Sequence, residues 1–537
     1  MPEPTTLDVV IVGAGFSGLY MMHKMRGLGF SARVYEAGSG VGGTWYWNRY
    51  PGARVDIESQ EYSYSFSPEL EDEWVWSERY AAQPELLKYL NHVADRFELR
   101  RDIQFETRIT AAVFDEASGR WTVSTNTGEV ISARFCVMAI GCLSVTKEVD
   151  LPGAETYLGH GYHTGQWPHE GVDFMGQRVG VIGTGSSAIQ SIPQIAKQAA
   201  HLTVFQRTPN FSVPAHNGPA DPEIAARWKA NRADLREQAR RSAGGFLSMD
   251  TSEALAVEAT PEERQRTFEA RWAQGGFCMG AAFADITVDL TANAYAAEFV
   301  ADKIREIVKD PEVAEKLIPK TYPFGTKRLC VDTGYHATYN RPNVTLVDLN
   351  ETPIETITPT GLRTSAKDYA FDSIVYAIGF DAMTGPLGRI DIQGRGGLAL
   401  RDKWTAGPRT YLGLMSAGFP NLFMVTGPGS PSVLSNMVTS IEQHVDWISD
   451  CVTWLTNHQQ GVIEATVEAE DAWVDHVNET ADTTLYVKAN SWYLGANIPG
   501  KPRVFLPYVG GVGVYREKCE AIAAKGYEGF ALSPAMA

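Results

Sequence analysis

The sequence lacks several features that mark common protein classes. Its six cysteines include no C-x-x-C pair, which argues against a dithiol relay or a structural zinc site, so we expect no metal. No apolar run reaches the ~18 residues that a membrane span requires. Residues 1–8 do not combine a basic start with an apolar core, as a secretory signal would. We therefore expect a cytoplasmic protein without a membrane partner, its thiols kept reduced.

Positive charge is also scarce. The chain has 47 Lys and Arg against 64 Asp and Glu, a formal net charge of −17. A nucleic-acid partner is not expected, because phosphate backbones are bound by clustered basic side chains. No low-complexity tract interrupts the 537 residues, which exceed the size of one ordinary hydrophobic core. Two or three globular domains are therefore expected.

What the sequence does contain is a glycine loop near its start. Residues 7–12 predict a buried strand, residues 18–28 a helix and residues 32–35 a second strand. Gly13, Gly15 and Gly18 lie between the first strand and the helix, and Glu36 ends the second strand. This spacing is typical of a dinucleotide site, in which the glycines let the backbone approach a pyrophosphate and the acid binds a ribose hydroxyl.

A second unit of the same plan follows. Residues 178–182 predict a strand, 187–200 a helix and 202–206 a strand, with Gly183 and Gly185 in the loop. Here Arg207 and Thr208 stand where the first unit has its acid. An arginine attracts a 2′-phosphate through charge-assisted hydrogen bonds, which favours NADPH over NADH. Two dinucleotide sites in one chain indicate two redox carriers, most simply a flavin and the nicotinamide that reduces it.

The composition changes along the chain in a way that predicts its domains. We expect an α/β fold with two Rossmann-like dinucleotide-binding domains and a helical insertion, because Arg, Glu, Ala and Lys dominate between the two halves of the second unit, with helical periodicity in 225–241, 261–274 and 293–309. Together with the family resemblance given below, which implies FAD as the flavin, the predicted parts are a first FAD-binding segment at 1–145, a first NADP-binding segment at 146–220 and the insertion at 221–319. The second NADP-binding segment spans 320–380. The second FAD-binding segment spans 381–537, and the same resemblance implies a mobile loop in it near 487–504.

A third motif lies between the two glycine loops. Residues 157–168 resemble the fingerprint F-x-G-x-x-x-H-x-x-x-W-P of Baeyer–Villiger monooxygenases, and the matching residues are Gly159, His163, Trp167 and Pro168. Tyr157 replaces the family's Phe, which keeps the ring and adds a hydroxyl. Residues 42–52, 183–190 and 491–501 are also similar to this family, and the similarity spans essentially the whole chain.

The resemblance implies an FAD-containing, NADPH-dependent enzyme. In this family oxygen adds to the reduced flavin to give a C4a-peroxide, whose anion converts a ketone to an ester or lactone. Such chemistry needs a permanent cation in a dry site, and arginine suits because it does not release its proton. By this resemblance Arg328 is the catalytic arginine, Asp56 orients it, and Lys327 lies near the 2′-phosphate of the nicotinamide cofactor.

The loops and the resemblance together predict the cofactor contacts. For FAD they are Gly13, Gly15, Ser17, Gly18, Glu36, Thr44, Trp45, Trp47, Arg54, Asp56, Tyr62, Ile109 and Met437. For NADP they are Gly183, Thr184, Gly185, Ser186, Ser187, Gln190, Arg207, Thr208, Lys327 and Trp492. Trp492 resembles the family's mobile-loop tryptophan. For His163, a hydrogen-bonded structural or hinge role is favoured over general acid–base catalysis.

The substrate is the least determined part of the prediction. Residues 427–437 are similar to the branch that accepts aryl ketones and steroids, so Ser432, Val433 and Leu434 are expected to line the pocket. We expect bulky, aromatic or cyclic ketones and molecular oxygen as substrates, sulfoxidation as a side activity, and a monomer or weak homo-oligomer. The alternative is a flavin-dependent monooxygenase that oxygenates nitrogen or sulfur. A pyridine nucleotide–disulfide oxidoreductase would require a redox-active cysteine pair beside the flavin.

Overall fold

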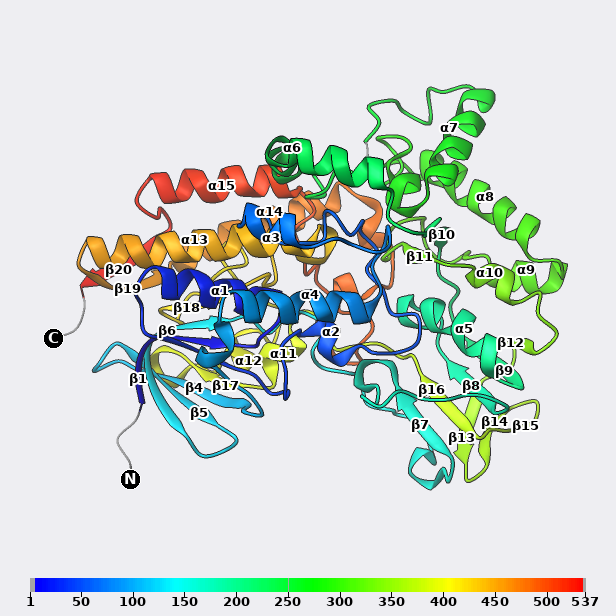
Figure 1. Ribbon diagram of the computed structural model, residues 1–537, viewed down its shortest axis with the longest axis horizontal. Helices are drawn as coiled ribbons and strands as arrows, with labels where there is room; N and C mark the ends of the chain where they lie inside the picture. Colours follow the sequence, from blue (N-terminus) through cyan, green and yellow to red (C-terminus); the bar gives the residue numbers. More distant parts are fainter. Residues whose placement is uncertain (1–4, 250, 535–537) are drawn as a thin grey trace.

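A large sheet built around the first glycine unit forms one half of the molecule (Figure 1). The computed structural model describes residues 5–249 and 251–534. The sheet has the strand order β17-β4-β5-β6-β1-β2-β3, with β18 also paired to β6. Its strands are β1 (Thr5–Val12), β2 (Ala32–Tyr35), β3 (Ile103–Gln104), β4 (Ile109–Asp115), β5 (Arg120–Thr125), β6 (Val130–Met138), β17 (Asp391–Gln393) and β18 (Leu422–Met424).

A second sheet, with all strands parallel, carries the second glycine unit. Its order is β12-β9-β8-β16-β7. The strands are β7 (His160–His163), β8 (Arg178–Ile182), β9 (His201–Gln206), β12 (Val344–Asp348) and β16 (Ser373–Tyr376). Smaller pairings join β10 (Ser212–Pro214) to β11 (Cys330–Asp332), and β13 (Ile354–Thr358) to β14 (Gly361–Thr364) and β15 (Asp368–Ala370). The predicted α/β class is confirmed.

Each glycine loop contains one position that only glycine can occupy, at the point where the chain turns from the strand to the helix. Gly13 follows β1 with φ +99°, and a Cβ there would lie 2.7 Å from the carbonyl oxygen of Ala139. Gly183 follows β8 with φ +109°, and its Cβ would meet the carbonyl oxygen of Ala377. Only glycine adopts this left-handed backbone next to a neighbouring strand without strain. The turns lead directly into α1 (Phe16–Gly27) and α5 (Ser186–Gln198).

The helical insertion forms as its composition predicts, with shifted ends. Its helices are α6 (Pro222–Arg241), α7 (Pro261–Gln274), α8 (Leu290–Ile307) and α9 (Pro311–Leu317). Helix α6 begins three residues before the predicted Ala225, because the Asp221 side chain caps the backbone N–H of Glu223 and a proline follows at the first turn. Helix α8 begins before the predicted Asn293 because Asp289 caps Thr291 and Ala292.

The last third of the chain returns to the first sheet. Strands β17 and β18 pair with β4 and β6. Helix α13 (Met437–Asn457) packs on α1, and α15 (Val512–Ala524) packs on α13 and α6 (Figure 1). The remaining helices and strands are α2 (Thr44–Trp47), α3 (Pro68–Glu73), α4 (Gln83–Arg96), α10 (Tyr335–Thr338), α11 (Gly385–Gly388), α12 (Leu400–Lys403), β19 (Gln460–Ala465), α14 (Val467–Asp482) and β20 (Phe530–Pro534).

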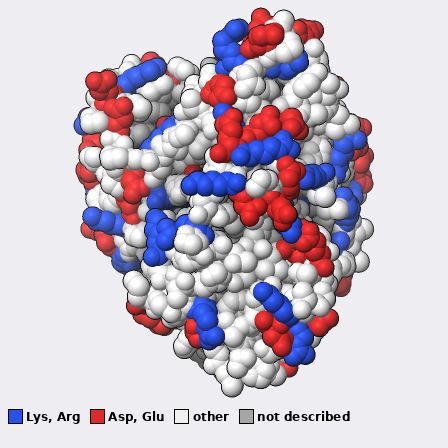
Figure 2. Space-filling model, turned by 90° about the vertical axis from the view of Figure 1, so that its right-hand side faces the viewer, with Lys and Arg blue, Asp and Glu red and all other residues white. Residues whose placement is uncertain are grey.

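Acidic and basic side chains alternate over the face shown in Figure 2. Exposed ion pairs also occur within the insertion, such as Arg305 with Glu298, Asp302 and Glu315 at 2.8–2.9 Å. Exposed pairs of this kind contribute little to stability, on the order of 0–1 kcal/mol each. In the described part of the chain, no helix has both the length and the apolar character that crossing a membrane requires.

Candidate active site

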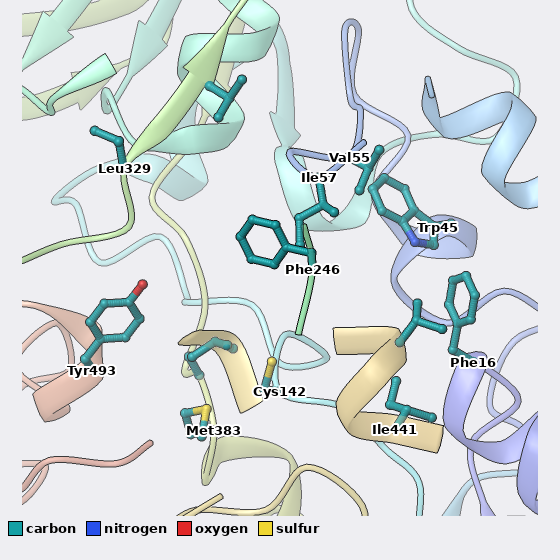
Figure 3. Close-up of a cluster of buried hydrophobic side chains, with 14 of the residues drawn as sticks. Phe16, Trp45, Val55, Ile57, Cys142, Phe246, Leu329, Met383, Ile441 and Tyr493 are labelled. Atoms are coloured by element: carbon teal, nitrogen blue, oxygen red, sulfur yellow. The ribbon is translucent and has the colours of Figure 1, made fainter. Parts of the chain in front are cut away.

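A cleft of about 1960 Å³ lies where the two glycine units face each other. Both glycine loops and Arg328 contribute to its wall. Because the loops follow β1 and β8, the cleft lies at the carboxyl ends of the strands, where open α/β sheets bind their ligands. Apolar side chains form part of its wall: Trp45, Val55, Ile57 and Ile441 line it, and Figure 3 shows them in one cluster with Phe246.

The predicted FAD contacts line this cleft with one exception. Gly13, Gly15, Ser17, Glu36, Thr44, Trp45, Trp47, Arg54, Asp56, Tyr62, Ile109 and Met437 are all in its wall. Gly18 is not, because it lies one turn into α1, where a Cβ would collide with the carbonyl oxygen of Gly13. Its role is therefore close packing of the helix on the loop, a correction to the predicted cofactor contact.

Glu36 organises the first glycine loop. Its carboxylate accepts hydrogen bonds from the backbone N–H groups of Ala14 and Gly38, both at 2.7 Å. Burial raises the pKa of Glu36, and these two hydrogen bonds oppose that rise. The side chain is 5% exposed and lines the cleft. A ribose contact from the same carboxylate stays a prediction.

Both loops fit the phosphates of a dinucleotide. Gly15 and Gly185 are the N-caps of α1 and α5, and neither supplies a side-chain cap. The first N–H groups of each helix therefore remain available to an anion, and the helix dipole adds positive potential. A Cβ at Gly185 would project into open space, which is the space that a bound phosphate would use. The residues present thus fit two dinucleotide cofactors.

The predicted NADP contacts also line the cleft. They are Gly183, Thr184, Gly185, Ser186, Ser187, Gln190, Arg207, Thr208, Lys327 and Trp492. Arg207 is exposed at the end of β9, and its carbonyl accepts a hydrogen bond from the Asn350 side chain at 2.7 Å. Lys327 packs its ammonium over the ring of Tyr322, 4.2 Å from the ring centre. Burial lowers the pKa of Lys327, and the nearby positive charge of Arg207 lowers it further.

Arg328 and Asp56 meet in the middle of the cleft. Nε of Arg328 donates to Asp56 Oδ2 at 2.9 Å, and Nη2 donates to both carboxylate oxygens at 2.8 Å. Nη1 donates to the carbonyl oxygen of Val433 at 2.6 Å. Burial lowers the pKa of Arg328, but the charge of Asp56, the nearby Tyr493 hydroxyl and the hydrogen bonds to Asp56 together raise it more, so the net pKa is raised. The guanidinium therefore stays a cation at every working pH.

The backbone around Asp56 is fixed from outside the cleft. Arg54 forms an isolated antiparallel bridge with Ala82, and the N–H of Val55 donates to the carbonyl of Ala81 at 3.1 Å. The Arg54 side chain also pairs with Glu78 at 2.7 Å. These contacts hold residues 53–56 as an extended segment with its carboxylate turned toward Arg328. Orientation of a catalytic cation by such rigid neighbours avoids reorganisation during the reaction.

Residues of the two units also bind each other directly. Tyr50 donates its hydroxyl to Oε1 of Gln190 at 2.8 Å, and Nε2 of Gln190 donates to the carbonyl of Arg54 at 3.1 Å. Gln190 lies in α5, whereas Tyr50 and Arg54 belong to the first unit. The helix that begins at the second glycine loop is therefore tied to the segment that carries Asp56.

The fingerprint segment packs behind the second glycine loop, outside the cleft wall. His163 accepts a hydrogen bond from the N–H of Gly165 at Nδ1, at 3.0 Å, and burial lowers its pKa to about 4. Thr164 shares a hydrogen bond with Ser187 of α5 at 3.1 Å. Trp167 is buried, 3% exposed. A neutral histidine that shapes a turn fits the predicted structural role and does not favour acid–base catalysis.

Two further fingerprint positions have steric explanations. A Cβ at Gly159 would lie 2.8 Å from the carbonyl oxygen of Asp372 and would collide with the Tyr157 hydroxyl. That hydroxyl, absent from the family's phenylalanine, donates to the carbonyl of Phe371 at 3.0 Å. The substitution therefore adds a hydrogen bond between this segment and the end of β15, and the ring keeps its place.

Only one of the three predicted pocket residues lines the cleft. Val433 does, and its carbonyl binds Arg328. Ser432 is fully buried with a left-handed φ of +42°, and its hydroxyl points inward to the carbonyl of Thr426 at 3.3 Å. Leu434 packs against the core cluster. Successive side chains of a 3₁₀ turn project about 120° apart, so the turn Ser432–Leu434 presents only Val433 to the cleft.

Sequence reasoning missed three residues around this site. Phe277 places its ring 4.9 Å from the Arg328 guanidinium carbon, and the buried Tyr493 lies close enough to the same side chain to raise its pKa. Lys147 lines the cleft near Arg207. Phe277 and Lys147 come from stretches with no motif of their own, so only the folded arrangement reveals them. Tyr493 lies in the similar run 491–501, but there the resemblance assigned a role only to the neighbouring Trp492.

Comparison with known proteins identifies the family. The sequence model of the pyridine nucleotide-disulphide oxidoreductase family matches residues 10–233. The chain is 45% identical to a Baeyer-Villiger monooxygenase of Pseudooceanicola batsensis, covering 97% of this chain and 95% of that protein. It is 44% identical to the acetone monooxygenase of Gordonia sp. (98% and 99% covered) and 44% identical to a phenazine N-monooxygenase of Lysobacter antibioticus (99% and 98% covered).

Solved structures agree with these relatives. An oxidised steroid monooxygenase bound to NADP superposes with a TM-score of 0.95 at 53% identity, covering 98% of this chain and 100% of that one. The monooxygenase OTEMO in complex with FAD and NADP gives a TM-score of 0.95 at 40% identity, with 99% and 100% covered. The six cysteines are all free and buried. The chain belongs to the Baeyer–Villiger monooxygenases, flavoenzymes that contain FAD and use NADPH.

Proposed function

We propose that this enzyme converts bulky, aromatic or cyclic ketones to esters or lactones, with sulfoxidation as a side activity. In the overall reaction, ketone, O₂, NADPH and a proton give ester, water and NADP⁺. The observation that carries the proposal is the Arg328–Asp56 pair in a cleft walled by both glycine loops. The 53% identity to a steroid monooxygenase supports bulky substrates.

Arg328 supplies a fixed positive charge to this reaction. Bound FAD, once reduced by NADPH, supplies the activation of oxygen. Hydrogen bonds to Asp56 and to the Val433 carbonyl fix the guanidinium, whose positive charge lines the cleft. We assign this positive charge to the stabilisation of the negative charge that develops on the ketone oxygen when the carbonyl carbon is attacked. A donor already oriented in a site poor in water stabilises such charge most strongly.

Asp56 and the apolar walls prepare this cation. Asp56 fixes the plane of the guanidinium through its bidentate contact, which limits the geometries that Arg328 can adopt. Val433, Ile57 and Ile441 line the cleft nearby and restrict water. A lower local dielectric constant strengthens every charge interaction inside the site. Asp56 therefore acts as a positioning residue and Arg328 as the catalytic one.

The cofactors are assigned to the two units. The segments 1–145 and 381–537 would bind FAD through the first glycine loop and Glu36, and the segments 146–220 and 320–380 would bind NADP through the second loop and Arg207. The insertion 221–319 would cover the substrate side, and the loop at 487–504 would close through Trp492. A monomer or weak homo-oligomer is proposed as the working form.

Oxygenation of nitrogen is the second candidate. The phenazine N-monooxygenase is as similar to this chain as the acetone monooxygenase, at 44% identity each. A heterocyclic nitrogen attacks an electrophilic oxygen and forms no negatively charged adduct on the acceptor. N-oxygenation therefore does not need the positive charge of Arg328 to stabilise an oxyanion on the substrate. Dependence on Arg328 therefore separates the two functions.

A product panel tests the proposal. The purified protein with FAD, NADPH and air would receive phenylacetone, cyclohexanone, a 20-ketosteroid, methyl phenyl sulfide and phenazine, with products measured by mass spectrometry. We expect ester from the aryl ketone or the steroid at the highest kcat/KM, and slower sulfoxide formation. A clear preference for cyclohexanone would contradict the bulky-substrate assignment. Phenazine N-oxide as the main product, undiminished by Arg328→Ala, would replace the proposed function with the second candidate.

A further inference from the structure

A lysine that no motif marks lies in the wall of the cleft beside Arg207. Lys147 is half-buried, in the crossing between the two sheets. Its N–H donates to the carbonyl of Gly379 at 3.0 Å, and the N–H of Asp381 donates to the carbonyl of Val145 at 2.9 Å. Thr146 pairs with Phe380 in an antiparallel bridge between these two bonds. The backbone that carries Lys147 is therefore as fixed as a strand.

The sheet order places Lys147 and Arg207 on opposite sides of the second glycine loop. Strand β8 leads into that loop and has β9 on one side and β16 on the other. Arg207 directly follows β9, and Lys147 is bonded to Gly379, three residues beyond β16. Neighbouring strands are about 4.8 Å apart, and three such spacings separate the two backbones, so they are on the order of 15 Å apart. Long side chains from both can approach one anion in front of the loop.

The charges around this point are of one sign. Burial lowers the pKa of Lys147 and of Lys327, and in both cases Arg207 is the charged neighbour that lowers it further. Neither lysine has a carboxylate within ion-pair distance among the described residues. The acids that flank this segment point elsewhere: Glu148 faces Arg389 at 3.8 Å, and Asp348 accepts from Asn350. Three clustered cations without a counter-charge favour a multiply charged anion.

The second glycine loop fits the pyrophosphate of a dinucleotide, which leaves another phosphate of the cofactor as the anion for these cations. The pyrophosphate of a dinucleotide has the N-terminus of α5 as its partner. Besides its pyrophosphate, NADPH has one further phosphate, the 2′-monoester. This group carries about −1.5 to −2 charges and three acceptor oxygens at pH 7. We propose that Lys147 is a third cation of the 2′-phosphate site, with Arg207 and Lys327, and so a determinant of NADPH preference. The inference rests on the 2′-phosphate role proposed for Arg207.

Direct binding tests this role without catalysis. NADP⁺, NAD⁺, 2′,5′-ADP and 5′-ADP would be titrated into the oxidised FAD holoenzyme by calorimetry. For Lys147→Ala we expect the Kd of NADP⁺ and of 2′,5′-ADP to rise about 5- to 10-fold, because one charge-assisted contact is lost. The Kd of NAD⁺ and of 5′-ADP should change less than about twofold. Lys147→Arg should keep the affinity of the parent, since it restores the charge.

The matched control is Lys197→Ala. Lys197 is exposed near the end of α5, where its ammonium contacts Gln194, so the variant removes the same charge away from the loop. Its affinities should equal those of the parent. Lys147→Ala with an unchanged Kd for NADP⁺, or with equal losses for NADP⁺ and NAD⁺, would overturn the inference. In the second case Lys147 would contact a part that both cofactors share.

Arg207→Ala distinguishes the role of Lys147 from the 2′-phosphate role proposed for Arg207. Arg207→Ala should lower the preference for NADP⁺ over NAD⁺ more than Lys147→Ala does. If Arg207→Ala lowers the preference and Lys147→Ala does not, only the role of Lys147 is wrong. If neither variant changes the preference, the 2′-phosphate site itself lies elsewhere. The FAD absorbance and thermal midpoint of each variant verify that the holoenzyme is folded.

Discussion

The guanidinium of Arg328 and the carboxylate of Asp56 form three hydrogen bonds of 2.8–2.9 Å across 272 residues of sequence. Arg328 directly precedes Leu329 and β11, in the part of the chain predicted to bind NADP, whereas Asp56 follows the segment tied to Ala81 and Ala82 in the first unit. Side chains of the pair are only 24% and 28% exposed. The pair therefore forms only when both units have the correct relative position.

Replacement of Arg328 tests its assignment to the oxygenation step. In Arg328→Ala, NADPH should still bleach the flavin in anaerobic stopped-flow experiments, because the glycine loops are untouched. Ester formation should fall on the order of 10²- to 10³-fold, the typical cost of losing one donor to a developing oxyanion. The electrons of the consumed NADPH should then reduce O₂ to hydrogen peroxide and not form ester. Ester formation within a few-fold of the parent would show that another group stabilises the charge.

Asp56→Asn tests whether Asp56 holds the guanidinium of Arg328 in place. Asparagine keeps the shape but offers one acceptor oxygen, so the bidentate contact is lost and Arg328 can turn. A small misplacement of a catalytic group can cost on the order of 10²-fold in kcat. We expect a fall of this size in ester kcat with a nearly unchanged KM for NADPH. Asp56→Glu should recover part of the loss, and a variant with parental kcat would exclude a positioning role.

Much of this arrangement could be predicted from local sequence. Glycine loops, the acid Glu36 and the basic Arg207 sit at fixed distances from strands, and the strands form because short β-branched runs are buried. Helix ends were displaced by up to three residues, since caps such as Asp221 and Asp289 decide them and the hydrophobic period does not. The fold class therefore follows from short-range signals.

The site's finer geometry could not be predicted in this way. Ser432 was expected in the pocket, but a left-handed turn directs its hydroxyl into the core. Gly18 was expected at the cofactor, but it serves the packing of α1. Lys147 was not identified, because its position depends on pairing with residues 379–381, more than 200 positions away. Long-range pairing and backbone handedness leave no local pattern.

Two neutral histidines should make stability depend on pH in the acid range. His444 is fully buried, accepts from the N–H of Thr426 at Nδ1 (2.8 Å), and burial lowers its pKa to about 3. The pKa of His163 is lowered to about 4 in the same way. In the unfolded chain both return toward 6.5, so below that pH the unfolded state binds protons that the folded state does not. Stability should be fully present above about pH 6.5 and should fall as the pH drops toward 4.

Thermal midpoints of the holoenzyme at pH 5, 6, 7 and 8 measure this effect. We expect little change between pH 7 and 8 and a clear decrease from 6 to 5. His444→Gln retains an acceptor for Thr426 and cannot take up a proton, so its decrease from pH 6 to 5 should be smaller than that of the parent. An identical decrease would assign the acid instability to carboxylates instead.

The segment that carries Trp492 is attached to residues 380–382, beyond the end of β16, by the side chains of Lys501 and Asn497. Nζ of Lys501 lies 2.6 Å from Oδ1 of Asp381, and Nδ2 of Asn497 donates to the carbonyl of Phe380 at 2.8 Å. Trp492 itself lines the cleft. In Lys501→Ala the segment should be held less firmly, so we expect the KM for NADPH to rise about 2- to 10-fold and the share of NADPH oxidised to hydrogen peroxide to increase.

Lys525→Ala is the matched control, since it removes an equal charge from an exposed pair with Glu528 at the end of α15. Oxygen electrodes with and without catalase report the hydrogen peroxide share in each variant. If Lys501→Ala and Lys525→Ala couple NADPH oxidation to ester formation equally well, the Lys501–Asp381 pair is a surface contact without influence on closure. A higher peroxide share in Lys501→Ala alone would mean that the attachment of this segment keeps the cleft sealed while oxygen is being transferred.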